Sequence, residues 1–124
     1  ALSCLEELGV AGYAGRRPDT LPYPIRKRVA LARAVVAEPR LLLLDEPAAG
    51  LGAADIDELA ALIGALRDRG PGCAVMLVEH HMDLVMRVSE QVVVLDFGRV
   101  IATGTPAEVQ RDPAVADAYL GTEA

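Results

Sequence analysis

Four consecutive leucines, Leu41 to Leu44, run directly into the acidic pair Asp45-Glu46. A continuous apolar run of this length is typical of a parallel strand buried on both faces, with the two acids at its carboxyl end. A second apolar run, over residues 74–78, ends on Glu79-His80-His81. Because the active groups of layered α/β domains gather at the carboxyl ends of their strands, these polar residues are the first candidates for chemistry.

Helical patterns alternate with the apolar runs. The spacing of apolar side chains predicts helices and a third strand, over residues 2–8, 25–36, 55–66 and 82–88 for the helices and 92–95 for the strand. Asp55 is expected to cap the third helix, with Glu58 three residues further on. The alternation predicts a layered α/β domain.

Turn signals organise the carboxyl-terminal part. Asp96-Phe97-Gly98 predicts a hairpin turn into a strand over residues 100–102. The same three residues spell the magnesium motif of protein kinases, but the chain lacks the His-Arg-Asp loop and the glycine-rich loop of that class. Residues 105–108 form a capping box with proline at the first helical position, and a last short helix is expected over 113–120.

Composition excludes several classes of protein. The chain has 12 basic and 18 acidic residues, a net charge of −6, which disfavours nucleic acid as a partner. No uncharged apolar run approaches the roughly 18 to 20 residues that span a bilayer. Cys4 and Cys73 lie far apart in sequence and indicate buried free thiols of a cytosolic protein. With three Tyr, one Phe and no Trp, the core is expected to be aliphatic.

The order of the motifs resembles the ATP-binding subunits of ABC transporters. Leu44-Asp45-Glu46-Pro47 matches the end of that family's Walker B strand. Ala49-Gly50-Leu51 looks like its D-loop, and Leu77-Val78-Glu79-His80 looks like its H-switch strand. Residues 96–106 resemble its terminal hairpin. The resemblance implies a P-loop NTPase-like α/β fold, with a mostly parallel sheet, flanking helices and a carboxyl-terminal hairpin.

Within this family, Leu84-Val85-Met86 and residues 112–121 look most like the branched-chain amino-acid importers. The resemblance divides the chain into three parts. Residues 1–39 would be the remainder of the α-helical signature subdomain, 40–104 the carboxyl-terminal half of the ATPase core, and 105–124 a helical tail.

The resemblance also implies roles for the residues at the strand ends. Asp45 would hold Mg²⁺ through water, Glu46 would be the general base, and His80 would contact the γ-phosphate of ATP. A lone histidine at a strand end is more often a structural group, but the ordered motifs favour the ligand role. His81 is expected to point away from His80, which argues against a two-histidine zinc site.

The signature position of the family departs from its usual pattern. Leu21-Pro22-Tyr23-Pro24-Ile25 stands where Leu-Ser-Gly-Gly-Gln is normal, after a proline-rich stretch expected to lack regular structure. Its two prolines offer neither the serine hydroxyl nor a backbone N–H, the groups that bind phosphate in the family. Gly52 of the D-loop stands where many members have Asp.

A basic cluster follows this segment at the positive end of the expected helix dipole. Arg26, Lys27 and Arg28 either substitute for the missing phosphate contacts or form a solvated basic face. Together with Tyr23 and with Gly50 of the D-loop, Arg26 and Lys27 are the candidate nucleotide contacts beside Asp45.

No Gly-x-x-x-x-Gly-Lys-Ser/Thr pattern occurs, and Lys27 is the sole lysine. Without that phosphate cradle the chain by itself is expected to be inactive. The simplest account is that it forms the carboxyl-terminal half of an ATPase domain whose P-loop lies upstream of Ala1.

The implied function is ATP binding and hydrolysis that powers branched-chain amino-acid import, with ATP and Mg²⁺ as cofactors. The implied partners are a second ATP-binding subunit, the transmembrane permease subunits and, indirectly, a solute-binding protein. The implied location is cytoplasmic, on the inner face of the membrane. Two alternatives stay open: a non-catalytic regulatory or docking module, and a soluble ABC-type ATPase acting on DNA or ribosomes.

Overall fold

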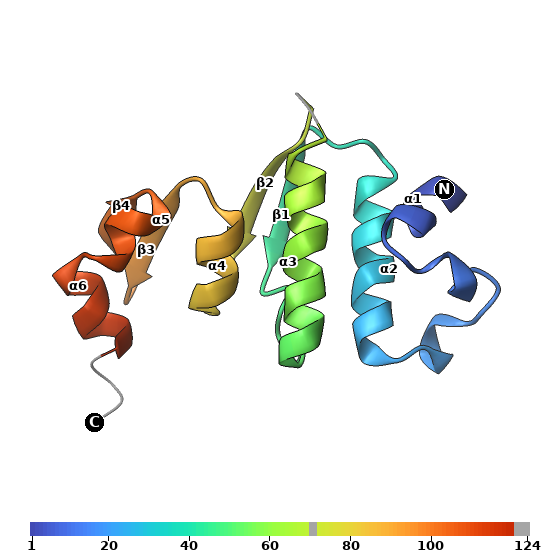
Figure 1. Ribbon diagram of the computed structural model, residues 1–124, viewed down its shortest axis with the longest axis horizontal. Coiled ribbons are helices and arrows are strands. Elements are labelled where there is room, and N and C mark those ends of the chain that lie inside the picture. Colours follow the sequence, from blue (N-terminus) through green and yellow to red (C-terminus); the bar gives the residue numbers. More distant parts are fainter. Residues whose placement is uncertain (70–71, 121–124) are drawn as a thin grey trace. The chain divides into compact units, whose positions relative to one another are not determined.

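The computed structural model describes residues 1–69 and 72–120 (Figure 1). The chain divides into two compact units, Ala1–Glu79 and His80–Ala124, and each is described by itself. The division into parts 1–39, 40–104 and 105–124 remains a prediction, and the end of the last part lies outside the described residues.

In its described residues, the first unit has three α-helices and two strands. They are α1 (Leu2–Glu7), α2 (Tyr23–Val35), β1 (Leu41–Asp45), α3 (Ala53–Arg67) and β2 (Ala74–Val78). The proline-rich stretch before α2 is less irregular than expected, because it holds a short 3-10 helix, Pro18–Thr20. Pro24 lies in the first turn of α2, as predicted, where its missing N–H has no intrahelical acceptor to lose.

The two strands of this unit form a parallel pair in which Leu43 lies opposite Met76. Leu42 is 4% exposed, whereas Leu43 and Met76 on the other face are 64% and 59% exposed. The prediction that β1 is buried on both faces is therefore wrong for this chain. One face of the sheet is covered, and the other presents aliphatic side chains to solvent because no described element packs on it.

The start of α3 differs from the prediction. Gly52 occupies the N-cap position with an extended backbone, and the helix begins at Ala53, so Asp55 lies inside the first turn and does not cap it. Glu58 instead forms an ion pair with Arg28 of α2. The predicted cap fails because the helix begins before Asp55. The Arg28–Glu58 ion pair joins α2 to α3, which run side by side in Figure 1.

The second unit begins with α4 (Met82–Val88), at the predicted bounds. The hairpin of β3 (Val92–Asp96) and β4 (Arg99–Gly104) follows, then α5 (Pro106–Gln110), α6 (Pro113–Val115) and a π-helical turn, Ala116–Leu120. The strands are antiparallel, so the described residues form one parallel pair and one antiparallel pair in separate sheets. The expectation of a mostly parallel sheet is not met within them.

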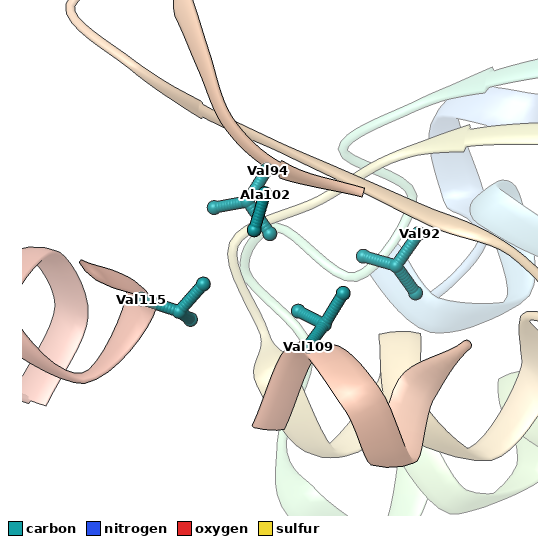
Figure 2. Close-up of a cluster of buried hydrophobic side chains, with 5 residues drawn as sticks. All are labelled: Val92, Val94, Ala102, Val109 and Val115. Atoms are coloured by element: carbon teal, nitrogen blue, oxygen red, sulfur yellow. The ribbon is translucent and has the colours of Figure 1, made fainter. Parts of the chain in front are cut away.

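The core of the second unit is aliphatic, as predicted. One face of the hairpin packs on α5 and α6 through five buried side chains (Figure 2), namely Val92, Val94, Ala102, Val109 and Val115. The other face is apolar and open, with Val93 57% and Val100 61% exposed. Phe97 and Gly98 form the turn with φ of 45° and 76°, the left-handed pair that a two-residue hairpin requires.

The capping box of α5 is present. The hydroxyl of Thr105 accepts from the amide of Glu108, and the Glu108 carboxylate accepts from the Thr105 amide at 2.8 Å. This backbone hydrogen bond holds the pKa of Glu108 below its ordinary value. Asp112 caps α6, because its carboxylate accepts a hydrogen bond from the Ala114 amide. The helix predicted after Asp112 therefore begins where expected.

Both cysteines are free thiols, as predicted. Cys4 is buried, but Cys73 is only half-buried, so the prediction of a buried thiol is wrong for Cys73. Among the helices of the described residues, none combines the length and apolar character that crossing a membrane would require.

Candidate functional site

The carboxyl edge of the β1–β2 pair carries the two predicted acids. Asp45 ends β1 opposite Val78, and the amide of Glu46 donates to the Val78 carbonyl at 2.8 Å. Glu46 has a φ of 45°, in the left-handed region that non-glycine residues rarely adopt. Such backbone strain is found where the surrounding structure holds a residue in place, often at functional sites.

The loop of residues 47–52 leaves this edge and leads into α3. Two turns shape it, in which Ala49 donates to the Glu46 carbonyl and Leu51 donates to the Ala48 carbonyl, both at 3.1 Å. Ala48 has 0% exposure. Its amide donates to the Glu79 carboxylate at 2.8 Å, so the residue that follows β2 holds the loop that follows β1.

A second contact reaches the loop from the start of α2. The hydroxyl of Tyr23 donates to the Ala49 carbonyl at 3.0 Å. The ring lies against Gly50, where an added Cβ would stand 3.0 Å from Cε1 of Tyr23. Gly50 also has a φ of 75°, so a side chain there would be strained as well as crowded. The structure therefore brings together the predicted residues Tyr23 and Gly50.

The basic cluster divides between two environments. The guanidinium carbon of Arg26 and the ammonium of Lys27 lie 5.7 Å and 5.4 Å from the centroid of the Tyr23 ring. These separations are typical of cation–π contacts. Arg28 pairs with Glu58 instead. Of the three basic residues, Arg26 and Lys27 lie beside the signature segment and could bind an anion there.

The two histidines lie in the second unit, after β2 has ended. The rings of His80 and His81 are stacked, with centroids 4.7 Å apart and planes at 30°. The prediction that His81 points away from His80 is wrong. Alternation of side chains holds only within a strand, and β2 ends at Val78, so the two residues do not follow it.

The residues of the first unit suit Mg²⁺ only in company with other ligands. Asp45 is exposed, and its carboxylate makes no hydrogen bond or ion pair with another described residue. Mg²⁺ is commonly held by one or two carboxylates together with phosphate oxygens and water. In the described residues no group of three or more His, Cys, Asp or Glu side chains gathers at metal-binding separation. A carboxylate and water would therefore need phosphate oxygens to complete the coordination.

Sequence reasoning gave no role to Glu79 and did not find the hydroxyl contact of Tyr23. Glu79 belongs to a motif that resembles the H-switch strand, but its partner, the Ala48 amide, lies 31 residues away. A glutamate directly after an apolar run was the available signal, because a charge beside apolar side chains needs a nearby donor.

Two family models match the chain. Residues 1–49 match the model described as "ABC transporter", and residues 99–124 match the model described as "Branched-chain amino acid ATP-binding cassette transporter". The second match falls on the terminal hairpin and tail, the region whose sequence resembles that subfamily.

Curated relatives are similar to this chain over nearly its whole length. It is 44% identical over 117 residues to the high-affinity branched-chain amino acid transport ATP-binding protein BraF of Pseudomonas aeruginosa, covering 94% of this chain and 46% of BraF. It is 40% identical to the corresponding protein LivG of Escherichia coli, covering 98% and 47%. It is 42% identical to the zinc import ATP-binding protein ZnuC of P. aeruginosa, covering 96% and 44%. The chain thus spans about half the length of these relatives.

Solved structures of ATP-binding cassettes share the fold of this chain. The ADP conformation of MJ1267, an ATP-binding cassette of an ABC transporter, superimposes with a TM-score of 0.85 at 26% identity, over 97% of this chain and 48% of that one. The fold and the carboxyl edge of the parallel pair therefore define part of an ATP-binding cassette. The chain belongs to the ABC transporter family of ATP-binding proteins, in its branched-chain amino acid group.

Proposed function

We propose that the chain serves as the carboxyl-terminal half of an ATP-hydrolysing subunit that powers branched-chain amino-acid import through an ABC transporter. The observation that carries the proposal is the carboxyl edge of the parallel pair, where Asp45 and the strained Glu46 stand side by side. The match of residues 99–124 to the branched-chain model supports the choice of solute class. A permease and a second ATP-binding subunit are the partners that this function needs.

Each candidate residue has a distinct task in this proposal. When bound, Mg²⁺ with ATP supplies charge neutralisation on the transferred phosphate. Asp45 holds the cation through water, because its carboxylate faces solvent at the strand end. Glu46 accepts a proton from the attacking water, and His80 donates a hydrogen bond to the γ-phosphate.

The signature segment supplies contacts to the nucleotide that the second ATP-binding subunit holds. Arg26 and Lys27 offer positive charge at the start of α2, in place of the serine hydroxyl and the amide that Pro22 and Pro24 lack. Tyr23 and Gly50 complete this side of the nucleotide site. Replacing Arg26 and Lys27 with alanine should weaken ATP-driven dimerisation, whereas unchanged dimerisation would assign them to a solvated basic face.

The experiment uses the protein as its complete gene encodes it, purified with its permease subunits. Glu46→Gln should leave ATP binding intact, trap a dimer and lower hydrolysis by orders of magnitude. Glu6→Gln, an exposed carboxylate of α1, is the matched control and should hydrolyse ATP like the wild type. Full ATP binding with no hydrolysis in the wild type would favour the non-catalytic module instead.

The solute is tested in membrane vesicles that contain the assembled transporter. ATP-dependent uptake of radiolabelled leucine is the expected result, and it should vanish with Glu46→Gln. Uptake of zinc without leucine would instead align this chain with the zinc-importing relative, at 42% identity.

A further inference from the structure

Two side chains that are far apart in sequence form hydrogen bonds with the backbone of the loop of residues 47–52. Tyr23, 26 residues before Ala49, donates its hydroxyl hydrogen to the Ala49 carbonyl at 3.0 Å. Glu79, 31 residues after Ala48, accepts from the Ala48 amide at 2.8 Å. Adjacent residues of one loop, Ala48 and Ala49, are therefore bound from two different places, the first residue of α2 and the residue that follows β2.

The loop is also closely packed at Ala48 and Gly50, next to these two hydrogen bonds. Ala48 is fully buried, and a Cβ at position 50 would be in tight contact with the ring of Tyr23, 3.0 Å from Cε1. Gly50 has a φ of 75°, a conformation that glycine adopts at little cost. Loss of either hydrogen bond would free a loop that has few other long-range hydrogen bonds among the described residues.

The loop is joined in turn to the backbone of Glu46. The Ala49 amide, in the same residue whose carbonyl Tyr23 binds, donates to the Glu46 carbonyl at 3.1 Å. Glu46 itself has a φ of 45°, so its backbone conformation depends on the hydrogen bonds around it. A displacement of Ala49 would therefore be transmitted directly to Glu46.

We propose that Tyr23 and Glu79 are positioning residues, which hold the loop of residues 47–52 and thereby set the orientation of Glu46. The inference rests on the proposed function, because it assigns Glu46 the role of general base. It gives Tyr23 a second task beside the proposed nucleotide contact, and the hydroxyl carries this task because its hydrogen is donated to the Ala49 carbonyl. It also links the signature segment to the residue after β2, so that a change at either reaches Glu46.

The test measures kcat and KM for ATP in the complete-gene protein. Tyr23→Phe removes only the hydroxyl and should lower kcat about fivefold, the scale of one neutral hydrogen bond, with KM unchanged. Glu79→Ala should lower kcat further, because the buried amide of Ala48 loses its acceptor. Glu79→Gln keeps an acceptor oxygen and should recover most of that loss. A purely structural role would predict no such rescue.

Tyr13→Phe is the matched control, because Tyr13 lies in the same unit and, among the described residues, its hydroxyl forms no hydrogen bond with the loop of residues 47–52. It should leave kcat unchanged. Amide hydrogen exchange supplies a readout that needs no activity: Tyr23→Phe should speed exchange at Ala49 and Leu51 severalfold and leave the β3–β4 hairpin unaffected.

The outcomes separate the two proposals. Wild-type protein that neither binds nor hydrolyses ATP would overturn the proposed function, while hydrogen exchange would still test the two hydrogen bonds to the loop. Active wild type with an unchanged kcat for both Tyr23→Phe and Glu79→Ala would overturn the positioning role. Faster exchange without any loss of kcat would overturn it too, because Glu46 would then be independent of the loop.

Discussion

The amide of Glu46 donates to the carbonyl of Val78 at 2.8 Å, which continues the pairing of β1 and β2 one residue beyond the end of β1. This hydrogen bond anchors Glu46 at the strand edge while its φ of 45° turns the chain into the following loop. The residue proposed as general base is therefore held by the sheet in a conformation that its own side chain disfavours.

Because of this strain, glycine should be more stabilising than alanine at position 46, the reverse of their order within a helix. Glu46→Gly should be more stable than Glu46→Ala by about 1 kcal/mol, because only alanine must place a Cβ in the left-handed region. Urea denaturation of both variants measures the difference. At exposed Ala61 within α3, Ala61→Gly should cost about 1 kcal/mol, the ordinary direction. Finding Glu46→Ala the more stable variant would mean that the backbone there is not strained.

Gly50 gives a second test of backbone conformation. Gly50→Ala should destabilise the chain by about 1–2 kcal/mol from the φ of 75° alone, with a further cost from contact with Tyr23. Gly64 lies within α3 with no atom within 4 Å of an added Cβ, so Gly64→Ala should stabilise by about 0.5–1 kcal/mol. Thermal unfolding of both variants compares them, and equal shifts would contradict the loop geometry.

Truncation of two adjacent leucines of β1 should change the stability of this 124-residue chain by very different amounts. Leu42→Ala should cost about 2–5 kcal/mol, because it empties a buried site. Leu43→Ala should cost within about 0.5 kcal/mol, because its side chain is 64% exposed. Leu43→Ser should also reduce the binding of a hydrophobic dye to the open face of the sheet. If the wild type and Leu43→Ser bind the dye equally, this face is covered in solution.

The capping box predicts a pH dependence in the second unit. The pKa of Glu108 is lowered by hydrogen bonding to Thr105, so the folded state favours the charged carboxylate. The stabilisation is present above the ordinary pKa of 4.5 and is lost as the pH falls through the lowered value.

Denaturation at pH 7 and at pH 3 should therefore show a smaller loss of stability for Glu108→Gln than for the wild type. Glu90→Gln changes an exposed glutamate of the same unit and should keep the wild-type dependence. An unchanged pH dependence in Glu108→Gln would remove Glu108 as its source.

Short-range chemistry is what the sequence determined by itself. The bounds of β2 and α4, the Phe97-Gly98 turn and the Thr105–Glu108 capping box agree with prediction because each depends on residues within a few positions of one another. The order of the motifs likewise led to the ABC transporter family, which the comparisons confirm.

Only the tertiary structure decided the contacts between distant segments. The ion pair of Glu58 with Arg28, and the hydrogen bonds of Tyr23 and Glu79 with one loop, had no local pattern to indicate them. The leucine run predicted a strand but not its open face, because local hydrophobicity does not specify which neighbours pack on each side. Periodicity and turn chemistry act within a few residues, whereas burial and side-chain partners depend on where the folded chain brings remote residues together.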